Sequence, residues 1–195
     1  CEKGVKAMNK VVFLDRDGTV NVEVDYLHKK EDFKFEENAD KAIKIINDLG
    51  YKVIVVTNQS GIARGYYTEN DLKTLHVYLD EELNKIGAKV DAYYYCPHHP
   101  NAKLDEYKID CECRKPEIGM FMEAAKDFSI DFSKSIIVGD KISDLEAGVR
   151  LGMKTVLVET GHGTEEKDRI YFKTDIYKNL YEFADLTTPT VSIVI

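Results

Sequence analysis

The chain alternates short runs of β-branched and apolar residues with longer segments whose apolar side chains recur every three or four positions. The runs have the length and composition of buried strands, and they are 10–15, 51–58, 90–96, 134–140 and 154–160. Helices are expected between them, at 38–50, 68–87, 115–128 and 143–152. Strands separated by helices predict a parallel sheet covered on both faces, a three-layer doubly wound α/β fold.

Polar residues at the helix starts refine these boundaries. Thr68 with Asp71 three positions later is a variant of the capping box, in which each side chain bonds the other's backbone. Asn38 and Ser143 are expected to cap their helices. Pro116 is expected in the first turn of its helix, where a missing N–H costs nothing.

Length, the lack of long apolar runs and net charge narrow the class of protein. A chain of 195 residues suits a single domain spanning 1–195. We expect residues 1–7 to be an extension and 187–195 to form a tail strand, either at the sheet edge or against a partner chain; otherwise the chain is expected to be a monomer. No apolar run approaches the roughly 20 residues of a membrane helix. The net charge of −8 disfavours nucleic acid and membrane partners.

Polar, glycine-bearing segments follow each of the five strands. They are DRDGT, TNQSGIARG, CPHHP with CECRK, GDKISD and ETGHGT. In a parallel sheet, ligands bind beyond the carboxyl ends of the strands. These segments are therefore expected to form one composite site.

Asp15 and Asp17 carry the strongest chemical signal. Two carboxylates this close repel each other unless a proton or a cation intervenes. Gly18 frees the backbone to turn and Thr19 adds a hydroxyl, a combination that suits Mg²⁺ bound by carboxylates and a substrate phosphate. The alternative is an ordinary turn after a strand.

At this point the chain resembles the haloacid dehalogenase (HAD) superfamily of phosphohydrolases. The resemblance rests on four parts taken together: DRDGT, VVTNQ, a lysine before a helix, and GDKISD. It covers residues 10–160 and implies a phosphatase with a HAD-like fold. The segment after the first motif, NVEVDYLHKKEDF, is too short for a large cap domain.

The resemblance implies a role for each matching residue. Asp15 would attack phosphorus to give an aspartyl-phosphate, and Asp17 would act as acid and then base. Asp15, Asp17 and Asp140 would hold Mg²⁺. Lys115 would supply positive charge beside the nucleophile and the phosphate.

Further residues are expected to contact substrate or orient these groups. Asp144 is expected to orient Lys115 from outside the metal ligands. The residues expected to bind substrate are Arg16, Asn21, Asp25, Thr57, Asn58, Gln59, Ser60, Arg64, Arg114, Lys115 and Lys141. His76 is expected to be a packed or solvated histidine without a functional role.

A second metal site is expected in the loop 96–116. Cys96, His98, Cys111 and Cys113 form two close pairs on two limbs, a ligand set typical of structural Zn²⁺. His99 competes for the histidine place, and the resemblance favours His98. A free-thiol cluster or a disulfide are the alternatives. The loop would present Arg114 and Lys115 to the site.

Within the superfamily, TNQSGIARG, CPHHP and CECRKP are similar to the D-glycero-D-manno-heptose 1,7-bisphosphate phosphatases. This resemblance implies removal of the 7-phosphate in the synthesis of nucleotide-activated heptose for surface polysaccharide. A cytoplasmic location is expected instead from the four cysteines and the lack of an export signal, which favour a reducing compartment. The histidinol-phosphate phosphatases share much of the pattern and remain an alternative. A non-catalytic zinc-knot binding module is a third, which the net charge disfavours.

Overall fold

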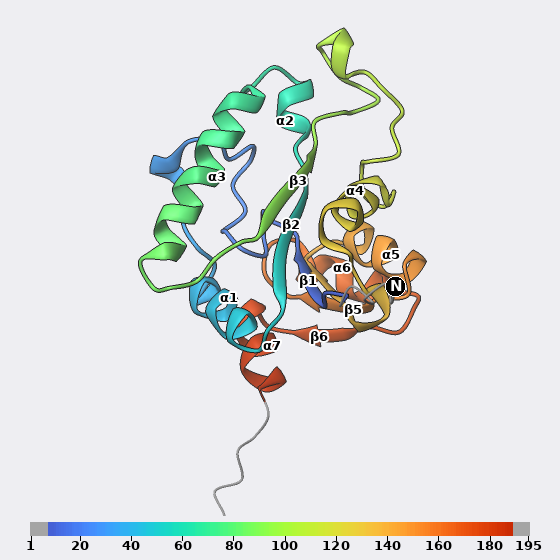
Figure 1. The fold of residues 1–195 in the computed structure, drawn as a ribbon. Coiled ribbons are helices and arrows are strands. Elements are labelled where there is room, and N and C mark those ends of the chain that lie inside the picture. The colour runs from blue at the N-terminus through green and yellow to red at the C-terminus, as the bar shows by residue number, and fades with distance from the viewer. Residues whose placement is uncertain (1–7, 189–195) are drawn as a thin grey trace, which may run out of the picture.

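A computed structural model describes residues 8–188 and confirms the three-layer α/β fold (Figure 1). All neighbouring strands pair in parallel, in the order β3-β2-β1-β4-β5-β6. The strands are β1 (Val11–Leu14), β2 (Lys52–Asn58), β3 (Ala92–Cys96), β4 (Ile136–Gly139), β5 (Lys154–Val158) and β6 (Asp175–Tyr177). No helix in the described part is long and apolar enough to span a membrane.

Helices cover both faces of this sheet. They are α1 (Ala39–Asp48), α2 (Ser60–Ala63), α3 (Glu69–Asn84), α4 (Gly119–Phe128), α5 (Ile142–Arg150), α6 (Gly163–Glu166) and α7 (Leu180–Thr187). In Figure 1, α1, α3 and α7 lie on one side of the sheet, and α4 and α5 on the other.

The pleat of each strand divides the core into two layers. In β1, Val12 and Leu14 pack toward α1, α3 and α7, whereas Val11 and Phe13 pack toward α4 and α5. The Phe13 ring meets the Phe121 ring edge to face, with centroids 4.9 Å apart. Because both faces of the central strands are buried, they show continuous apolar runs instead of alternation.

Three helix starts differ from the sequence-based predictions. Asn38 has a left-handed backbone, and its side chain accepts from Lys41 instead of capping α1. Lys141 is the residue before α5, so Ser143 lies inside that helix. Pro116 precedes α4 because residues 114–119 first make a turn, in which Glu117 N bonds Arg114 O. The Thr68–Asp71 capping box is confirmed.

The structure also adds elements that the sequence did not predict. Short helices α2 and α6 and strand β6 are too short for a clear periodic pattern, whereas α7 buries Leu180, Phe183 and Ala184 on one face, a helical spacing that was missed. Thr187, expected in the tail strand, ends α7, and Thr188 directly follows the helix. Residues 189–195 of that prediction, like the expected extension 1–7, lie outside the described residues.

Strand order places β1 at the point where the two halves of the sheet diverge. Its neighbours are β2 and β4, which continue the chain on opposite sides. A crevice forms beyond the carboxyl end of a strand at such a point. Asp15 follows β1 directly, and its N–H bonds Val138 O of β4 at 3.0 Å, so it lies in that crevice.

His76 is packed, as expected, and generates a test of the fold. It lies in α3 with its ring stacked on Tyr93, the centroids 4.2 Å apart, and is 6% exposed. Burial lowers the pKa of His76 to about 3, so the imidazole stays neutral in the folded chain. Because the unfolded chain binds a proton near pH 6.5 and the folded one does not, His76 should destabilise the fold progressively below that pH.

We expect His76→Phe to remove this dependence. Between pH 7 and pH 5 the wild type should lose about 2 kcal/mol more unfolding free energy than the variant. Urea denaturation at both pH values measures the difference. Equal losses in the two proteins would show that His76 is not held neutral.

Candidate active site

The ammonium group of Lys115 lies at the centre of a buried set of charges. Its Nζ lies 2.9 Å from Asp15 Oδ1 and 2.7 Å from Asp144 Oδ1, and it donates to Val56 O at 2.7 Å. An ammonium has three N–H donors, so all three are used. Burial alone would lower the pKa of Lys115, but the charges of Asp144 and Asp15 raise it. Lys115 therefore stays protonated and orients Asp15, and the expected contact with Asp144 is confirmed.

Asp140 adds a third buried carboxylate, one oxygen of which accepts no hydrogen bond within residues 8–188. The carboxylates of Asp15, Asp140 and Asp144 lie within 4.8 Å of one another, and all three residues are buried. Burial, together with the charges of Asp15 and Asp144, raises the pKa of Asp140. Its Oδ2 accepts from His162 N at 2.9 Å, whereas its buried Oδ1 has no partner among residues 8–188. An orphaned carboxylate oxygen beside a second carboxylate fits a hard cation such as Mg²⁺.

Gly18 allows the DRDGT segment to lie against the carboxylate of Asp140. A Cβ added at Gly18 would lie 2.4 Å from Asp140 Oδ2, and the φ of +79° is one that side-chain-bearing residues rarely adopt. Glycine is therefore required here for the strand-end segments of β1 and β4 to meet.

Asp17 lies in a cradle of hydrogen-bond donors. Arg16 Nη2 lies 2.7 Å and 2.8 Å from its two oxygens, Asn21 Nδ2 donates at 3.0 Å, and Gln59 Nε2 donates at 2.9 Å. Burial would raise the pKa of Asp17, but the Arg16 charge and these hydrogen bonds outweigh burial and lower it. This arrangement favours the carboxylate form of Asp17, the form that accepts a proton.

Gln59 links Asp17 to the end of β2. Its Nε2 also donates to Thr57 Oγ1 at 2.9 Å, while its Oε1 accepts from Tyr67 at 2.5 Å. Because Thr57 Oγ1 accepts one bond, its own hydroxyl hydrogen remains free to donate. Thr57 is thus prepared to bind an anionic oxygen.

These groups line a cavity of about 200 Å³ beyond the strand ends. Its wall is rich in carboxylates and has two ammonium groups, those of Lys115 and Lys141. The lining residues are Asp15, Asp17, Glu23, Asp25, Tyr26, Thr57, Asn58, Gln59, Ser60, Gly61, Tyr67, Lys115, Lys141, Ser143, Asp144 and His162. A phosphate dianion is repelled by such a wall unless a bound cation offsets the carboxylates.

Two residues expected to bind substrate lie behind the cavity wall. Arg16 and Asn21 are both fully buried, and neither lines the cavity. Their side chains bind Asp17, and Arg16 also donates to Leu27 O at 3.2 Å. Both therefore position Asp17, and their expected contact with substrate stays a prediction.

Two further arginines lie outside the cavity wall. Arg64 stacks near the Tyr26 ring, 5.9 Å from its centroid. Arg114 donates to His98 O at 3.3 Å and lines a neighbouring hollow with His99 and Lys115. Their expected contacts with a distal phosphate stay predictions.

Several lining residues were missed by sequence reasoning, among them Glu23, Tyr67 and His162. Glu23 follows the first motif between Asn21 and Asp25, and His162 follows β5 in the segment ETGHGT. His162 lies in a strand-end segment, and Glu23 lies four residues beyond DRDGT, between two residues that were identified. Their positions could therefore have indicated both. Tyr67 had no such signal, because its contact with Gln59 depends on how α2 folds.

The four expected zinc ligands come together in the loop between β3 and α4. Four ligands on a tetrahedral zinc lie roughly 3.6–3.8 Å apart. Five of the six separations lie between 3.1 Å, for Cys111 Sγ and Cys113 Sγ, and 3.8 Å, for Cys96 Sγ and His98 Nδ1, and all four atoms lie within 4.8 Å of one another. These sulfurs are too far apart for a disulfide bond of about 2.05 Å. The ligand set thus fits zinc.

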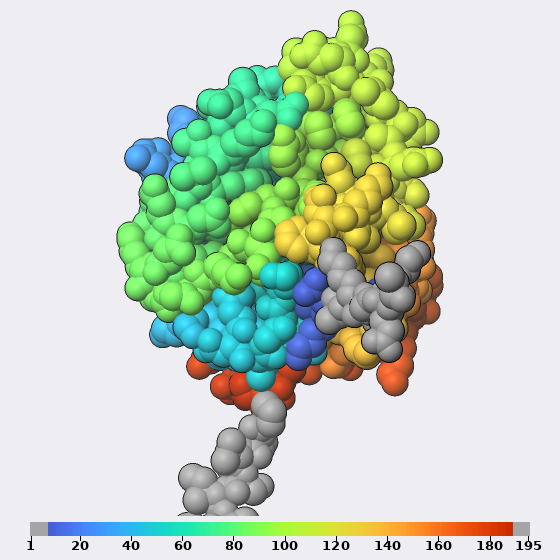
Figure 2. Space-filling model, in the orientation of Figure 1, coloured from blue at the N-terminus to red at the C-terminus, as the bar shows by residue number. Residues whose placement is uncertain are grey.

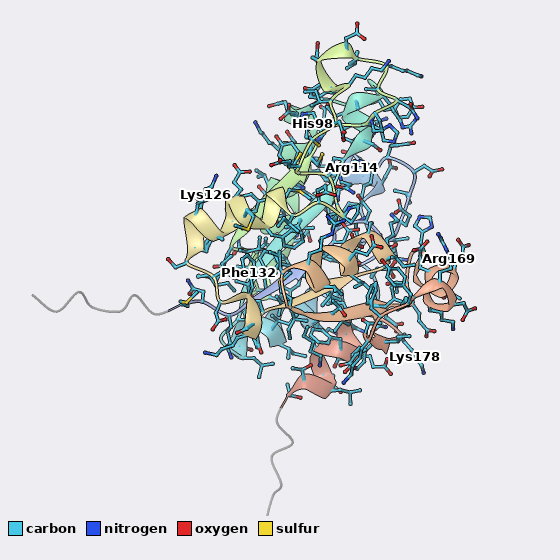
Figure 3. All side chains as sticks on the ribbon, turned by 90° about the vertical axis from the view of Figure 1, so that its right-hand side faces the viewer. His98, Arg114, Lys126, Phe132, Arg169 and Lys178 are labelled. Carbon is cyan, nitrogen blue, oxygen red and sulfur yellow. The ribbon has the colours of Figure 1, made fainter. Side chains whose placement is uncertain are left out.

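The neighbouring His99 lies outside this cluster. Its Nδ1 accepts from Asn101 N at 3.0 Å. In Figure 3, His98 lies beside sulfur atoms and next to Arg114. The structure therefore favours His98 for the histidine place, as expected.

Lys115 is anchored on two sides. Cys113 belongs to the cluster two positions earlier, and the loop before it projects from the molecular surface (Figure 2). Asn58 Oδ1 accepts from Lys115 N at 3.0 Å, and Asn58 Nδ2 donates to Lys115 O at 3.1 Å. Asn58 therefore fixes the backbone of Lys115 directly, in addition to any effect of the cluster.

Known proteins that are similar to this chain are named as phosphatases. The HAD-hydrolase-like family model matches residues 112–183. The D-glycero-alpha-D-manno-heptose-1,7-bisphosphate 7-phosphatase of Photorhabdus laumondii is 48% identical over 80% of this chain and 86% of its own length. The corresponding beta-anomer enzyme of Haemophilus influenzae is 47% identical over 79% of this chain and 84% of its own.

Solved structures agree with these relatives. A D,D-heptose 1,7-bisphosphate phosphatase from B. bronchiseptica, complexed with magnesium and phosphate, is 31% identical with a TM-score of 0.82, covering 91% of this chain and 97% of that one. The Burkholderia thailandensis enzyme of the same name is 29% identical with a TM-score of 0.68, covering 92% and 100%.

The cysteine cluster generates a second test. We expect Cys111→Ser to remove most of the bound zinc and, through the loosened loop, to lower activity about 10- to 100-fold. Zinc per chain is measured by elemental analysis, and activity by phosphate release. Since Asn58 still holds Lys115, the loss should stay short of complete.

The adjacent residue provides the control. His99→Asn changes a neighbouring imidazole outside the cluster and should leave zinc content at one per chain. Loss of zinc from His99→Asn with retention in a His98→Asn variant would reverse the assignment of the histidine ligand.

Proposed function

Since this chain belongs to the D-glycero-D-manno-heptose-1,7-bisphosphate 7-phosphatase family of HAD-like hydrolases, we propose that it hydrolyses the 7-phosphate of that sugar bisphosphate. The observation that carries the proposal is the Lys115 ammonium between Asp15 and Asp144 at the end of the central strand. It orients one carboxylate at the mouth of a small polar cavity, as a nucleophile requires.

In the first step, Asp15 attacks the phosphorus of the 7-phosphate. The bond from phosphorus to the sugar oxygen breaks, and a bond to the Asp15 carboxylate forms. The leaving alkoxide takes a proton from Asp17, which must first be protonated against the pull of Arg16. Thr57, Asn58 and Ser60 lie in the wall, where they supply donors to the phosphoryl oxygens.

In the second step, water attacks the aspartyl-phosphate. Asp17, now a carboxylate held by Arg16, Asn21 and Gln59, accepts the proton of that water. Its lowered pKa is suited to this return to the ionised form. The products are inorganic phosphate and the heptose 1-phosphate, with Asp15 regenerated.

We propose Mg²⁺ and Zn²⁺ as the two cofactors. Asp15, Asp140 and the backbone carbonyl of Asp17 would hold Mg²⁺, which offsets the charge of the phosphoryl oxygens during transfer. The orphaned Oδ1 of Asp140 supports this assignment. Cys96, His98, Cys111 and Cys113 would hold a structural Zn²⁺, because three thiolates and an imidazole leave no open position.

The cellular setting follows from the proposed substrate. The product would feed synthesis of nucleotide-activated heptose for surface polysaccharide. We propose a cytoplasmic location, since reduced thiols that hold zinc persist in a reducing compartment. We also propose that the chain is a monomer. The partner is a small phosphorylated sugar, with Asp25 in the wall as a partner for its hydroxyl groups.

Replacement of the nucleophile tests the mechanism. Asp15→Asn keeps the shape but removes the attacking charge, so kcat should fall by at least about 10³-fold. Asp48→Asn, at the exposed end of α1, makes the same chemical change and should leave kcat unaltered. Full phosphatase activity in Asp15→Asn would exclude the covalent mechanism.

A substrate panel tests the proposed function. Both anomers of the heptose bisphosphate and histidinol phosphate are compared by kcat/KM. One heptose anomer should exceed histidinol phosphate by at least about 10-fold, the selectivity that a few specific polar contacts supply. An equal or better rate on histidinol phosphate would reassign the substrate.

A further inference from the structure

Three loops meet in a charged contact at the edge of the cavity. Lys141 Nζ lies 3.3 Å from Glu23 Oε2, and His162 Nε2 lies 3.8 Å from the same oxygen. Glu23 follows β1, Lys141 follows β4 and His162 follows β5. All three line the cavity that the proposed function assigns to the phosphoryl group.

The two cavity lysines differ in how firmly they are held. Lys115 is buried, and its three donors are occupied by Asp15, Asp144 and Val56. Lys141 has a side chain that is 36% exposed, and within residues 8–188 its ammonium has one hydrogen-bond partner, Glu23. Lys141 is thus the cation with donors left for an incoming anion.

The contact between Glu23 and Lys141 is also weak enough to exchange. Both side chains reach solvent, Glu23 being 24% exposed, and ion pairs open to water contribute little to stability. A phosphate dianion carries more charge and more acceptor oxygens than one carboxylate, so it competes well for the same ammonium.

We propose that Glu23 is a displaceable counter-ion of Lys141, which a bound phosphoryl group replaces and which returns as inorganic phosphate leaves. The inference rests on the proposed function, because it takes Lys141 as a phosphate contact. Glu23 lowers phosphate affinity in two ways: it occupies Lys141, and its charge repels the dianion. It thereby limits retention of the product.

His162 marks where Glu23 can rest after displacement. Its Nε2 lies near Glu23 Oε2, and its side chain is 46% exposed. His162 N is bonded to Asp140, which fixes the backbone of this residue beside the cavity. A neutral imidazole with hydrogen on Nε2 can donate to the carboxylate that has left Lys141.

Glu23→Gln tests the inference, because it keeps the shape of the side chain and removes its charge. Titration calorimetry with inorganic phosphate at saturating Mg²⁺ measures the dissociation constant directly. We expect it to fall by about two- to fivefold, the size of effect typical of a partly exposed pair. The inhibition constant of phosphate in turnover assays should fall by the same factor.

Two variants separate the effect of the Glu23–Lys141 contact from that of negative charge near the cavity in general. In a Lys141→Met background, Glu23→Gln should change phosphate affinity by less than the single replacement does. Asp25→Asn removes a charge from the same loop at a residue that makes no ion pair with Lys141 within residues 8–188, and its effect should also be smaller.

An unchanged or weaker phosphate affinity in Glu23→Gln would overturn the inference. So would an equally large gain in phosphate affinity from Glu23→Gln in the Lys141→Met background. A higher Mg²⁺ requirement in place of tighter phosphate binding would assign Glu23 to the cation instead. Phosphate binding by a wild type that does not hydrolyse the heptose bisphosphate would reject the proposed function alone.

Discussion

The contact of one buried ammonium with two buried carboxylates organises the whole site. Lys115 cannot be removed from water without partners, and neither can Asp15 or Asp144, because isolated buried charges are very costly. Their contacts at 2.7 Å and 2.9 Å pair the ammonium with both carboxylates, and one negative charge remains to be offset. Since these residues come from three distant parts of the chain, the contact forms only when β1, α5 and the loop before α4 are all in place.

Asp140 and Asp17 show two further ways of keeping charge in this small volume. Asp17 is compensated by protein donors, above all Arg16, and is complete without a ligand. Asp140 keeps a buried oxygen without a partner within residues 8–188. The same crevice thus separates a carboxylate reserved for proton transfer from carboxylates suited to a cation, and this separation makes a two-step phosphoryl transfer chemically coherent.

The central strands could be predicted from sequence because burial on both faces leaves a continuous apolar run. Strand β6 could not, since Asp175–Tyr177 has no such run and pairs with β5 through its backbone. At the site, strand-end position predicted that Asp15, Asp140 and Lys115 gather. It did not predict that the Arg16 side chain turns inward to Asp17, because sequence position does not determine the direction of a side chain in a loop.

The backbone bond between Asp15 N and Val138 O has a consequence for motion. Amides in central strands exchange with solvent mainly through global unfolding, whereas loop amides exchange through small local openings. We therefore expect the backbone of Asp15 to open more rarely than that of Glu23, which lies in a loop. Chemistry and ligand exchange are in this way assigned to parts of the chain that move on different timescales.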